Sequence, residues 1–315
     1  MNLKKLIPIS TIQADYSFDY KFSVFTPVYN RSNTLKRVFK SLNDQTFRDF
    51  ELIIINDGST DNSNEVIQDL MQTATFKVNY INNKENKHKM ACFIQAIKFA
   101  KGEFILPFDS DDECTPNALK VFNDSYENIP EEMKGEISGV TCLCEDQFGN
   151  LVGEKFPNQP YFSNTIKRQF SNPKSSEKWG FTKTQILKSI EIDESIFSKG
   201  LIPEGLIWNF IAKEGYKTKY VNDILRIYYI GSDNSLSVQN LKKNSLGMAI
   251  YSLSILNWFY KDYLMTYPKA FIKRVYTLLR AAHFLKFNLN DYLNAIDSVL
   301  LKLIFITGWP FKRFF

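Results

Sequence analysis

The sequence predicts an α/β fold in which a mostly parallel sheet is flanked by helices, with a helical extension at the C-terminus. Two observations support this prediction. Strand and helix patterns alternate through the first 130 residues, as they do in doubly wound sheets. In addition, the segment FELIIIN (Phe50–Asn56) is apolar on both faces, as a central parallel strand is.

Each element is predicted from its own pattern. Short apolar runs predict strands at residues 21–25, 50–56, 76–81 and 103–108. Apolar residues at helical spacing predict the helices that follow them, at 31–45, 57–71, 91–100 and 115–126. The pattern then becomes irregular, with two strands joined by a turn at 139–154, helices at 181–190 and 203–216, and a strand at 218–230. The last predicted elements are helices at 241–260, 268–287 and 289–306.

Charge is unevenly distributed along the 315 residues, although the net charge is only +5. Residues 1–237 carry 28 Lys and Arg against 31 Asp and Glu, or −3, whereas residues 238–315 carry 11 against 3, or +8. The chain is therefore an acidic body with a basic tail.

The cysteines and the apolar runs bear on the cellular compartment. Cys92, Cys114, Cys142 and Cys144 lack the paired spacing of a zinc site, and no secretory signal opens the sequence. We therefore expect reduced thiols and a cytoplasmic location. No stretch reaches the ~18 uncharged apolar residues of a spanning helix, since the closest approach, VLLKLIFI, is interrupted by Lys302.

Four acidic side chains lie within five positions in the segment PFDSDDE, directly after the apolar run EFIL. Crowded carboxylates repel one another, and burial would raise their pKa values. Ligands of doubly wound sheets bind at the carboxyl ends of the strands. We therefore expect this cluster to share one binding edge with the loops at Tyr29 and Asp57.

Two ordered motifs carry a family resemblance. The segments VFTPVYNRSNTLKRVFKSLNDQTFRDFELIIINDGSTDNS and AKGEFILPFDSDDECTPNAL resemble the nucleotide-diphospho-sugar domain of family 2 glycosyltransferases, which has the Rossmann-like GT-A fold. The resemblance is close over residues 22–128 and looser over residues 179–237. It implies an inverting transfer of a sugar from a nucleotide donor, typically a UDP-sugar, assisted by a divalent cation, Mn²⁺ or Mg²⁺.

The resemblance also implies a domain organisation. We expect a catalytic domain at residues 1–237, with a nucleotide-sugar half at about 20–130 and an acceptor half at about 131–237. Residues 238–315 would form a helical extension that associates with a membrane or a partner.

The resemblance assigns the nucleobase pocket to the first two loops of the binding edge. Pro27, Val28 and Tyr29 would form its floor and side, with the Tyr29 ring against a pyrimidine. Asp57 matches the family carboxylate that accepts a hydrogen bond from uracil N3–H, a group that cytosine lacks. This favours a UDP or dTDP donor. Tyr29 could alternatively be ordinary turn packing, and the DGST segment also fits a turn with a helix cap.

Asp109, Ser110 and Asp111 match the family's DxD motif. Divalent cations of this class prefer oxygen ligands and keep several waters, so one or two carboxylates and phosphate oxygens suffice. Asp111 is the expected ligand, with Asp109 on the donor ribose or a metal-bound water. Spacing alone does not separate Asp111 from Asp112 and Glu113, which stay alternatives. The acidic cluster could instead cap the helix that follows, because the helix dipole favours negative charge there.

The stretch NKENKHKM resembles a subset of the family in which a lysine faces the diphosphate. Lys89 is the first candidate by register and Lys87 the second, while His88 is expected to be a surface residue. A solvated basic loop is the alternative reading.

The acceptor site and the general base are expected in the second half of the chain. An inverting transfer needs a base to take the acceptor proton, and in LIPEGLIWNF Glu204 matches the family base, although Gly205 replaces the usual Asp. Trp208 would form an acceptor platform on the same helical face. Glu204 could also be an ordinary acid in a first helical turn. The segment RIYYIGSDNSLS resembles the one that closes over the donor, which makes Arg226 and Ser235 candidate contacts.

The sequence therefore predicts an inverting glycosyltransferase that moves a sugar from a UDP- or dTDP-sugar to a saccharide or lipid-linked acceptor, in the synthesis of a surface polysaccharide such as lipopolysaccharide or capsule. Two other classes stay open. One is a non-catalytic sugar-nucleotide or partner-binding module. The other is a sugar-phosphate nucleotidyltransferase, although PVYNRSN lacks the Gly-rich loop of that class. No nucleic-acid partner is expected, and an oligomer is compatible with the sequence.

The end of the chain combines aromatic and basic residues. In LLKLIFITGWPFKRFF, Lys312 and Arg313 lie among four aromatic residues, Trp309, Phe311, Phe314 and Phe315. This composition is typical of interfacial segments. We therefore expect the extension to dock on the inner face of a membrane, or alternatively to pack on the catalytic domain or a second subunit.

Overall fold

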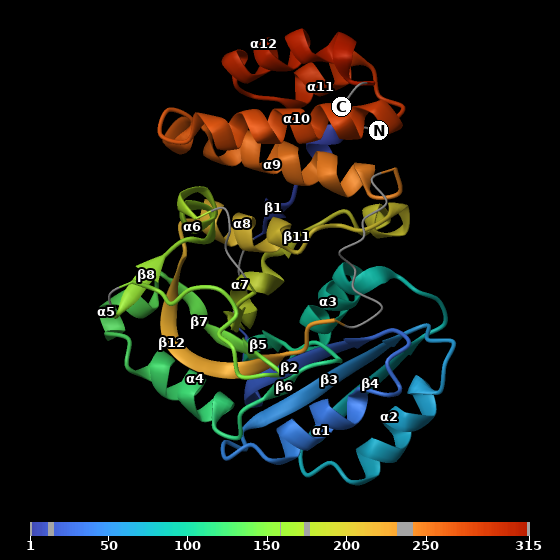
Figure 1. Cartoon of the computed structure of the whole chain (residues 1–315), viewed down its shortest axis with the longest axis vertical. Helices are drawn as coiled ribbons and strands as arrows, with labels where there is room; N and C mark the ends of the chain where they lie inside the picture. Colours follow the sequence, from blue (N-terminus) through green and yellow to red (C-terminus); the bar gives the residue numbers. More distant parts are fainter. Residues whose placement is uncertain (1, 12–15, 158, 173–176, 232–241, 314–315) are drawn as a thin grey trace. The chain divides into compact units, whose positions relative to one another are not determined.

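The computed structural model describes residues 2–11, 16–157, 159–172, 177–231 and 242–313 (Figure 1). The predicted contacts Ser235, Phe314 and Phe315 lie outside these residues. The chain divides into two compact units. The sheet unit comprises Ile12–Ser189 and Gly215–Ser235, and the helical unit comprises Met1–Thr11, Ile190–Glu214 and Leu236–Phe315.

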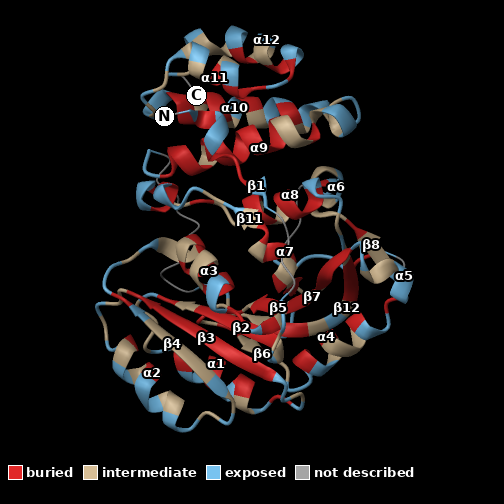
Figure 2. Cartoon of the chain, turned by 180° about the vertical axis from the view of Figure 1, so that it is seen from behind, coloured by how far each residue is buried: buried red, intermediate tan, exposed pale blue. Residues whose placement is uncertain are grey.

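The first sheet of the sheet unit has the strand order β10-β5-β2-β3-β4. Four of its strands run parallel, and β10 pairs with β5 in the antiparallel direction. These strands are β2 (Tyr20–Val28), β3 (Phe50–Asp57), β4 (Lys77–Asn83), β5 (Gly102–Pro107) and β10 (Thr182–Lys183). Every residue of β3 is buried, as its apolar pattern predicted (Figure 2).

Helices connect the parallel strands. They are α1 (Leu35–Asn43), α2 (Ser63–Gln72), α3 (His88–Phe99) and, after β5, α4 (Ala118–Glu127). Helix α1 buries Leu35, Val38, Phe39 and Leu42, the positions whose spacing predicted it. The alternation of strands and helices in the first half of the chain is thus confirmed.

A second, mixed sheet has the order β6-β12-β7-β9, with β8 also pairing with β12. Its strands are β6 (Glu113–Cys114), β7 (Ile137–Asp146), β8 (Tyr161–Ser163), β9 (Trp179–Gly180) and β12 (Lys217–Tyr228). The prediction of two strands within residues 139–154 is wrong for the second. After β7 the chain turns at Gly149, and Leu151 makes only an isolated bridge to Glu145. Short helices α5 (Glu131–Lys134), α6 (Thr165–Ser171) and α7 (Thr184–Lys188) complete the unit.

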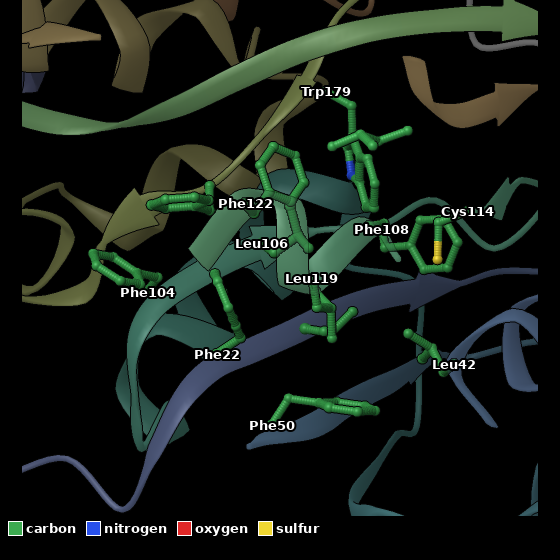
Figure 3. Close-up of a cluster of buried hydrophobic side chains, with 14 of the residues drawn as sticks. Phe22, Leu42, Phe50, Phe104, Leu106, Phe108, Cys114, Leu119, Phe122 and Trp179 are labelled. Atoms are coloured by element: carbon green, nitrogen blue, oxygen red, sulfur yellow. The ribbon is translucent and has the colours of Figure 1, made fainter. Parts of the chain in front are cut away.

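An aromatic core joins the two sheets (Figure 3). The ring centroids of Phe104 and Phe181 are 4.5 Å apart, and those of Phe122 and Trp179 are 5.2 Å apart. The Trp179 indole N–H donates to the carbonyl of Pro107 at 2.6 Å. This bond ties β9 to the end of β5, from which the acidic cluster begins.

The helical unit is built from segments that are distant in the sequence. It contains η1 (Leu3–Leu6), β1 (Ile9–Ser10), β11 (Ile190–Glu191), η2 (Glu194–Lys199), α8 (Gly205–Lys213), α9 (Ser245–Tyr263), α10 (Pro268–Phe284), α11 (Leu289–Ala295), α12 (Val299–Gly308) and η3 (Trp309–Phe311). Helix α10 packs against α9 and α12 (Figure 1). None of the helices in the described part of the chain is long and apolar enough to cross a membrane.

The predicted helix at 289–306 is wrong as a single element, because the structure has two helices there. Helix α11 begins with a capping box between Asn288 and Asp291. The chain then leaves helical geometry at Ile296, and the Asp297 N–H donates to Asn257 Oδ1 at 3.0 Å. Ser298 caps α12 by accepting from the Leu301 N–H. Side chains that bond nearby backbone groups favour such breaks.

Candidate donor site of the sheet unit

Side-chain hydrogen bonds hold the loops after β2 and β3 together. The Asn30 N–H donates to Ser59 Oγ at 3.0 Å, the Arg31 N–H to Ser63 Oγ at 2.9 Å, and the Ser32 N–H to Asp61 Oδ2 at 3.2 Å. These loops carry Tyr29 and Asp57. The expected shared edge is therefore present for the first two loops.

A glycine lets the third loop approach them. Gly58 has φ +70°, and a Cβ on it would lie 2.6 Å from the carbonyl carbon of Glu85. Only glycine fits that conformation and that distance without a shift of backbone. The close approach places the chain before α3 next to Asp57, whose Oδ1 accepts the Lys87 N–H at 2.9 Å. Lys87 thus meets Asp57 through its backbone.

The predicted pocket residues differ sharply in burial. Val28 is 1% exposed and Asp57 is 3% exposed, whereas the Tyr29 side chain is 47% exposed directly after β2. Asp57 Oδ1 also accepts from the Asn83 amide at 3.2 Å. Pro27 and Val28 lie in register with Ile55 and Asn56 of β3. The edge therefore offers an exposed aromatic ring and a buried, oriented carboxylate.

The carboxylate of Asp109 is held by two cations from distant parts of the chain. Lys89 Nζ lies 2.6 Å from Asp109 Oδ1, and Arg226 Nη2 lies 2.8 Å from Oδ2. Burial would raise the pKa of Asp109, but the two cations outweigh it and hold that pKa well below its usual range. Of the two lysine candidates, Lys89 is the one whose ammonium group reaches the cluster.

Arg226 also binds Asp112, and both side chains are almost fully buried, at 3% and 1% exposed. Its Nε donates to Asp112 Oδ2 at 2.7 Å, while its Nη1 lies 3.3 Å from Glu177. Burial raises the pKa of Asp112 to about 6, against the opposing effects of Arg226 and the Tyr229 N–H. We call Lys89, Asp109, Asp112, Glu177 and Arg226 the buried ion network.

Asp111 points to a different partner. Its Oδ2 lies 3.3 Å from Arg31 Nη2, and its backbone carbonyl accepts from Arg37 at 3.1 Å. Ser110 is buried, and its carbonyl accepts from the Thr34 hydroxyl at 2.7 Å. The loop between β5 and β6 is thus fastened to the first turn of α1 and the loop before it.

The carboxylates of the cluster fit a divalent cation unequally. Both oxygens of Asp109 take part in ion pairs, and Asp112 is bound to Arg226. Asp111 is partly exposed, and one of its oxygens takes part in the ion pair with Arg31. Within the described ranges, no group of three His, Cys, Asp or Glu side chains converges to hold a metal ion. Asp111 fits a site with one carboxylate and phosphate oxygens, and the assignment of a metal to Asp111 and Asp109 stays a prediction.

The predicted base and acceptor platform lie in the helical unit. Glu204 is the N-cap residue of α8, its side chain does not cap the helix, and Trp208 follows it by one turn. A Cβ on Gly205 would lie 3.0 Å from Tyr251 Oη, so the small residue accommodates the Tyr251 ring of α9. Packing within the helical unit thus accounts for the departure from the usual Asp. The roles of Glu204 and Trp208 stay predictions.

The sequence analysis missed the part that arginines play. Arg31 was not considered, and Arg226 was considered only as a donor contact, whereas the structure makes it the centre of the buried ion network. The one available signal was an arginine in an otherwise apolar strand, RIYYI, because a buried charge needs a partner.

Comparisons with known proteins agree with this fold. The sequence profile of "Glycosyl transferase family 2" matches residues 23–133. The "Putative colanic acid biosynthesis glycosyl transferase WcaA" of Escherichia coli K12 is 39% identical over 191 residues, which cover 59% of this chain and 68% of that protein. The chain belongs to glycosyltransferase family 2.

Other relatives extend the match. The "GalNAc(5)-diNAcBac-PP-undecaprenol beta-1,3-glucosyltransferase" of Campylobacter jejuni is 27% identical over 224 residues, which cover 69% of this chain and 67% of that protein. The crystal structure of S. aureus TarS 1-349 with UDP-GlcNAc has a TM-score of 0.56 and 18% identity over 93% of this chain and 88% of that one. This likeness shows the GT-A fold. The chain is thus an enzyme of the glycosyltransferase class, and the predicted fold is confirmed.

Proposed function

We propose that this glycosyltransferase is an inverting enzyme that takes a sugar from a UDP-sugar or dTDP-sugar and transfers it to a saccharide or lipid-linked saccharide. The observation that carries the proposal is that Tyr29, Asp57, Lys89 and the Asp109–Asp111 segment lie at one sheet edge, on segments joined by hydrogen bonds and ion pairs. We also propose that the catalytic domain comprises residues 1–237 and so includes Glu204.

The nucleotide-sugar donor would bind along this sheet edge, with its nucleobase at Tyr29 and Asp57. Tyr29 offers its exposed ring to the nucleobase, a stacking contact that in nucleic-acid binding contributes about 1–3 kcal/mol per base. Asp57 is buried and held by two donors, so its carboxylate can accept from the pyrimidine N3–H without first paying for reorientation. An N3–H donor is present in uracil and thymine, which supports a UDP or dTDP donor.

The diphosphate would lie where Lys89 and Arg31 meet the aspartates. Both cations pair with carboxylates, Lys89 with Asp109 and Arg31 with Asp111. A diphosphate is an anion that competes for the same cations. Asp111 would hold a divalent cation, with Asp109 beside it, and such a cation neutralises charge on the departing diphosphate. Arg226 would keep Asp109 and Asp112 ionised and oriented.

The chemical step requires a base. Glu204 would accept the proton of the acceptor hydroxyl, whose oxygen then forms the new bond to the anomeric carbon as the bond to the diphosphate breaks. Trp208, one turn further along α8, would hold the acceptor ring. The names of relatives that act in colanic acid and teichoic acid biosynthesis, or on an undecaprenol-linked saccharide, support a surface-polysaccharide or lipid-linked acceptor.

The proposal is tested by donor hydrolysis across a panel of UDP- and dTDP-sugars with and without Mn²⁺. We expect slow hydrolysis of at least one donor that needs the cation. Asp111→Asn should lower both donor affinity in Mn²⁺ and turnover. Asp124→Asn, which changes an exposed acid on α4, is the control and should behave as wild type. If the protein binds UDP-sugars but neither hydrolyses them nor transfers the sugar to any added acceptor, a non-catalytic binding module is favoured instead.

A further inference from the structure

Helix α12 is apolar on both sides. Leu301 and Phe305 are fully buried, and the Phe305 ring packs 5.3 Å from that of Tyr292. On the other side, Val299 is 72% exposed, Leu303 56% and Ile306 40%. At about 100° per residue these three side chains form one stripe along the helix. A surface helix is normally polar on its outer side, and a helix that is apolar all round is normally covered.

Two more exposed apolar side chains belong to the same segment. Leu300 is 51% exposed beside the stripe, and Phe311, in η3 directly after α12, is 55% exposed. We call Val299, Leu300, Leu303, Ile306 and Phe311 the outer α12 face. Single exposed apolar side chains are ordinary, but a contiguous set marks a contact surface.

Cations lie in the same segment as this face. Residues 299–313 contain Lys302, Lys312 and Arg313 and no Asp or Glu. Lys312 Nζ lies 3.4 Å from the centre of the Trp309 ring, so an aromatic side chain and a cation share the end of the helix. This is the composition of segments that lie in a lipid–water interface.

The last helices of the helical unit also carry an excess of positive charge. Residues 242–313 carry 11 Lys and Arg and only three acids. Of the acids, Asp297 pairs with Lys4, and Asp291 takes part in the capping box of α11. The excess positive charge therefore stays available to a negatively charged surface.

We propose that the outer α12 face docks on an anionic lipid surface, with its apolar stripe at the boundary between headgroups and acyl chains and its cations among the headgroups. Charge complementarity selects this occupant. A second copy of the chain would bring two strongly basic surfaces together, whereas anionic lipids neutralise them. A helix with an apolar stripe along one exposed side and cations at its end suits a position in the plane of the lipid–water interface.

The test is sedimentation of the full chain with vesicles of phosphatidylcholine alone or with phosphatidylglycerol added, in the absence of any sugar donor. We expect binding only to the anionic vesicles, weakened by salt. Lys312→Glu should lower the partition coefficient about fivefold or more. The double variant Leu303→Glu, Ile306→Glu should lower it about tenfold or more for each side chain withdrawn from the lipid.

A matched control separates this surface from exposed apolar residues in general. Phe148, in the turn after β7 of the sheet unit, is 75% exposed, and Phe148→Glu should bind vesicles as wild type does. Leu303, Ile306 and Phe148 are exposed, so circular dichroism and melting temperature should be unchanged in their variants. Equal binding to both vesicle types, or wild-type binding by the double variant, would overturn the proposal. So would a stable dimer that the double variant dissociates while vesicles leave the wild type unbound.

Discussion

The buried ion network of the sheet unit and the outer α12 face of the helical unit depart from ordinary burial in opposite directions. In the network, charges lie inside, with Arg226 3% and Asp112 1% exposed. On α12, apolar side chains lie outside, with Val299 72% exposed. Folding alone favours neither arrangement, because buried charges lose hydration and exposed apolar surface gains nothing from folding.

The difference teaches where to look for function. Charges that are buried and paired, as those of Arg226 and Asp112 are, cannot move far, so they suit the orientation of groups that meet a small ligand such as a sugar nucleotide. An apolar face with cations around it has no such precision and suits a broad, fluid partner such as a lipid surface. The predictions below test each half of this contrast.

The largest expected effect concerns a carboxylate outside the network. Glu204→Gln should lower transfer by about 10²–10⁴-fold, because it removes the proposed general base. Binding of the UDP-sugar should stay near wild type, since the residues of the candidate donor site belong to the sheet unit. Turnover and isothermal titration of the donor measure the two effects.

Glu214→Gln is the matched control for this variant, because Glu214 follows the other end of the same helix. It should transfer normally. If Glu204→Gln keeps more than about a tenth of wild-type turnover, well short of the expected range, then Glu204 is not the base. Asp193 and Glu194 are the next acids to replace, and Asp112 follows them, although its burial against Arg226 makes it a poor proton acceptor for a substrate.

The second effect is on the free energy of unfolding, and it tests whether Arg226 stabilises the buried ion network. Arg226→Met leaves Asp109 and Asp112 buried beside an uncharged side chain, and breaking a buried pair in this way typically costs about 3–5 kcal/mol. Urea unfolding measures the loss. Lys217→Met breaks an ion pair with Glu136 whose side chains are 47% and 64% exposed, and it should cost less than about 1 kcal/mol. Similar losses for both variants would remove the distinction between buried and surface charges.

Apolar spacing predicted the local structure more accurately than it could predict contacts between residues distant in the sequence. The four parallel strands and their helices were predicted from apolar spacing, because those elements bury the residues that define the pattern. Arg226 lies 117 positions from Asp109, and no local pattern connects them. Likewise, the pairing of Lys4 with Asp297 places the start of the chain in the helical unit, and only the fold shows this.

The candidate site was predictable to the extent that short motifs carry it. Motifs predicted Tyr29, Asp57, Lys89 and Asp109, and the structure places them at or next to the ends of the strands along one sheet edge. The break between α11 and α12 was not predicted. Asp297 and Ser298 each interrupt the helix through one hydrogen bond. The apolar residues on both sides of them keep helical spacing, so the pattern predicted one continuous helix.

A smaller effect is expected for the nucleobase. Asp57→Asn keeps the size of the side chain but removes its charge, and a hydrogen bond to a charged group contributes about 1.5–3 kcal/mol. UDP affinity should therefore fall roughly 10- to 100-fold, and the preference for UDP over CDP should narrow, as measured by titration calorimetry. Asp69→Asn, on the exposed side of α2, is the control. An unchanged UDP affinity would remove Asp57 from the pocket.

The smallest expected effect tests the other half of the contrast, on α12. Leu303→Ala removes an exposed side chain and should change the free energy of unfolding by no more than about 0.5 kcal/mol. Leu301→Ala, two residues earlier on the same helix, removes a fully buried one and should cost about 2–5 kcal/mol. Urea unfolding of both variants without lipid makes the comparison within one residue type. A large loss for Leu303→Ala would mean that this leucine stabilises the folded chain itself, and the outer α12 face would then have no surplus apolar surface to offer a membrane.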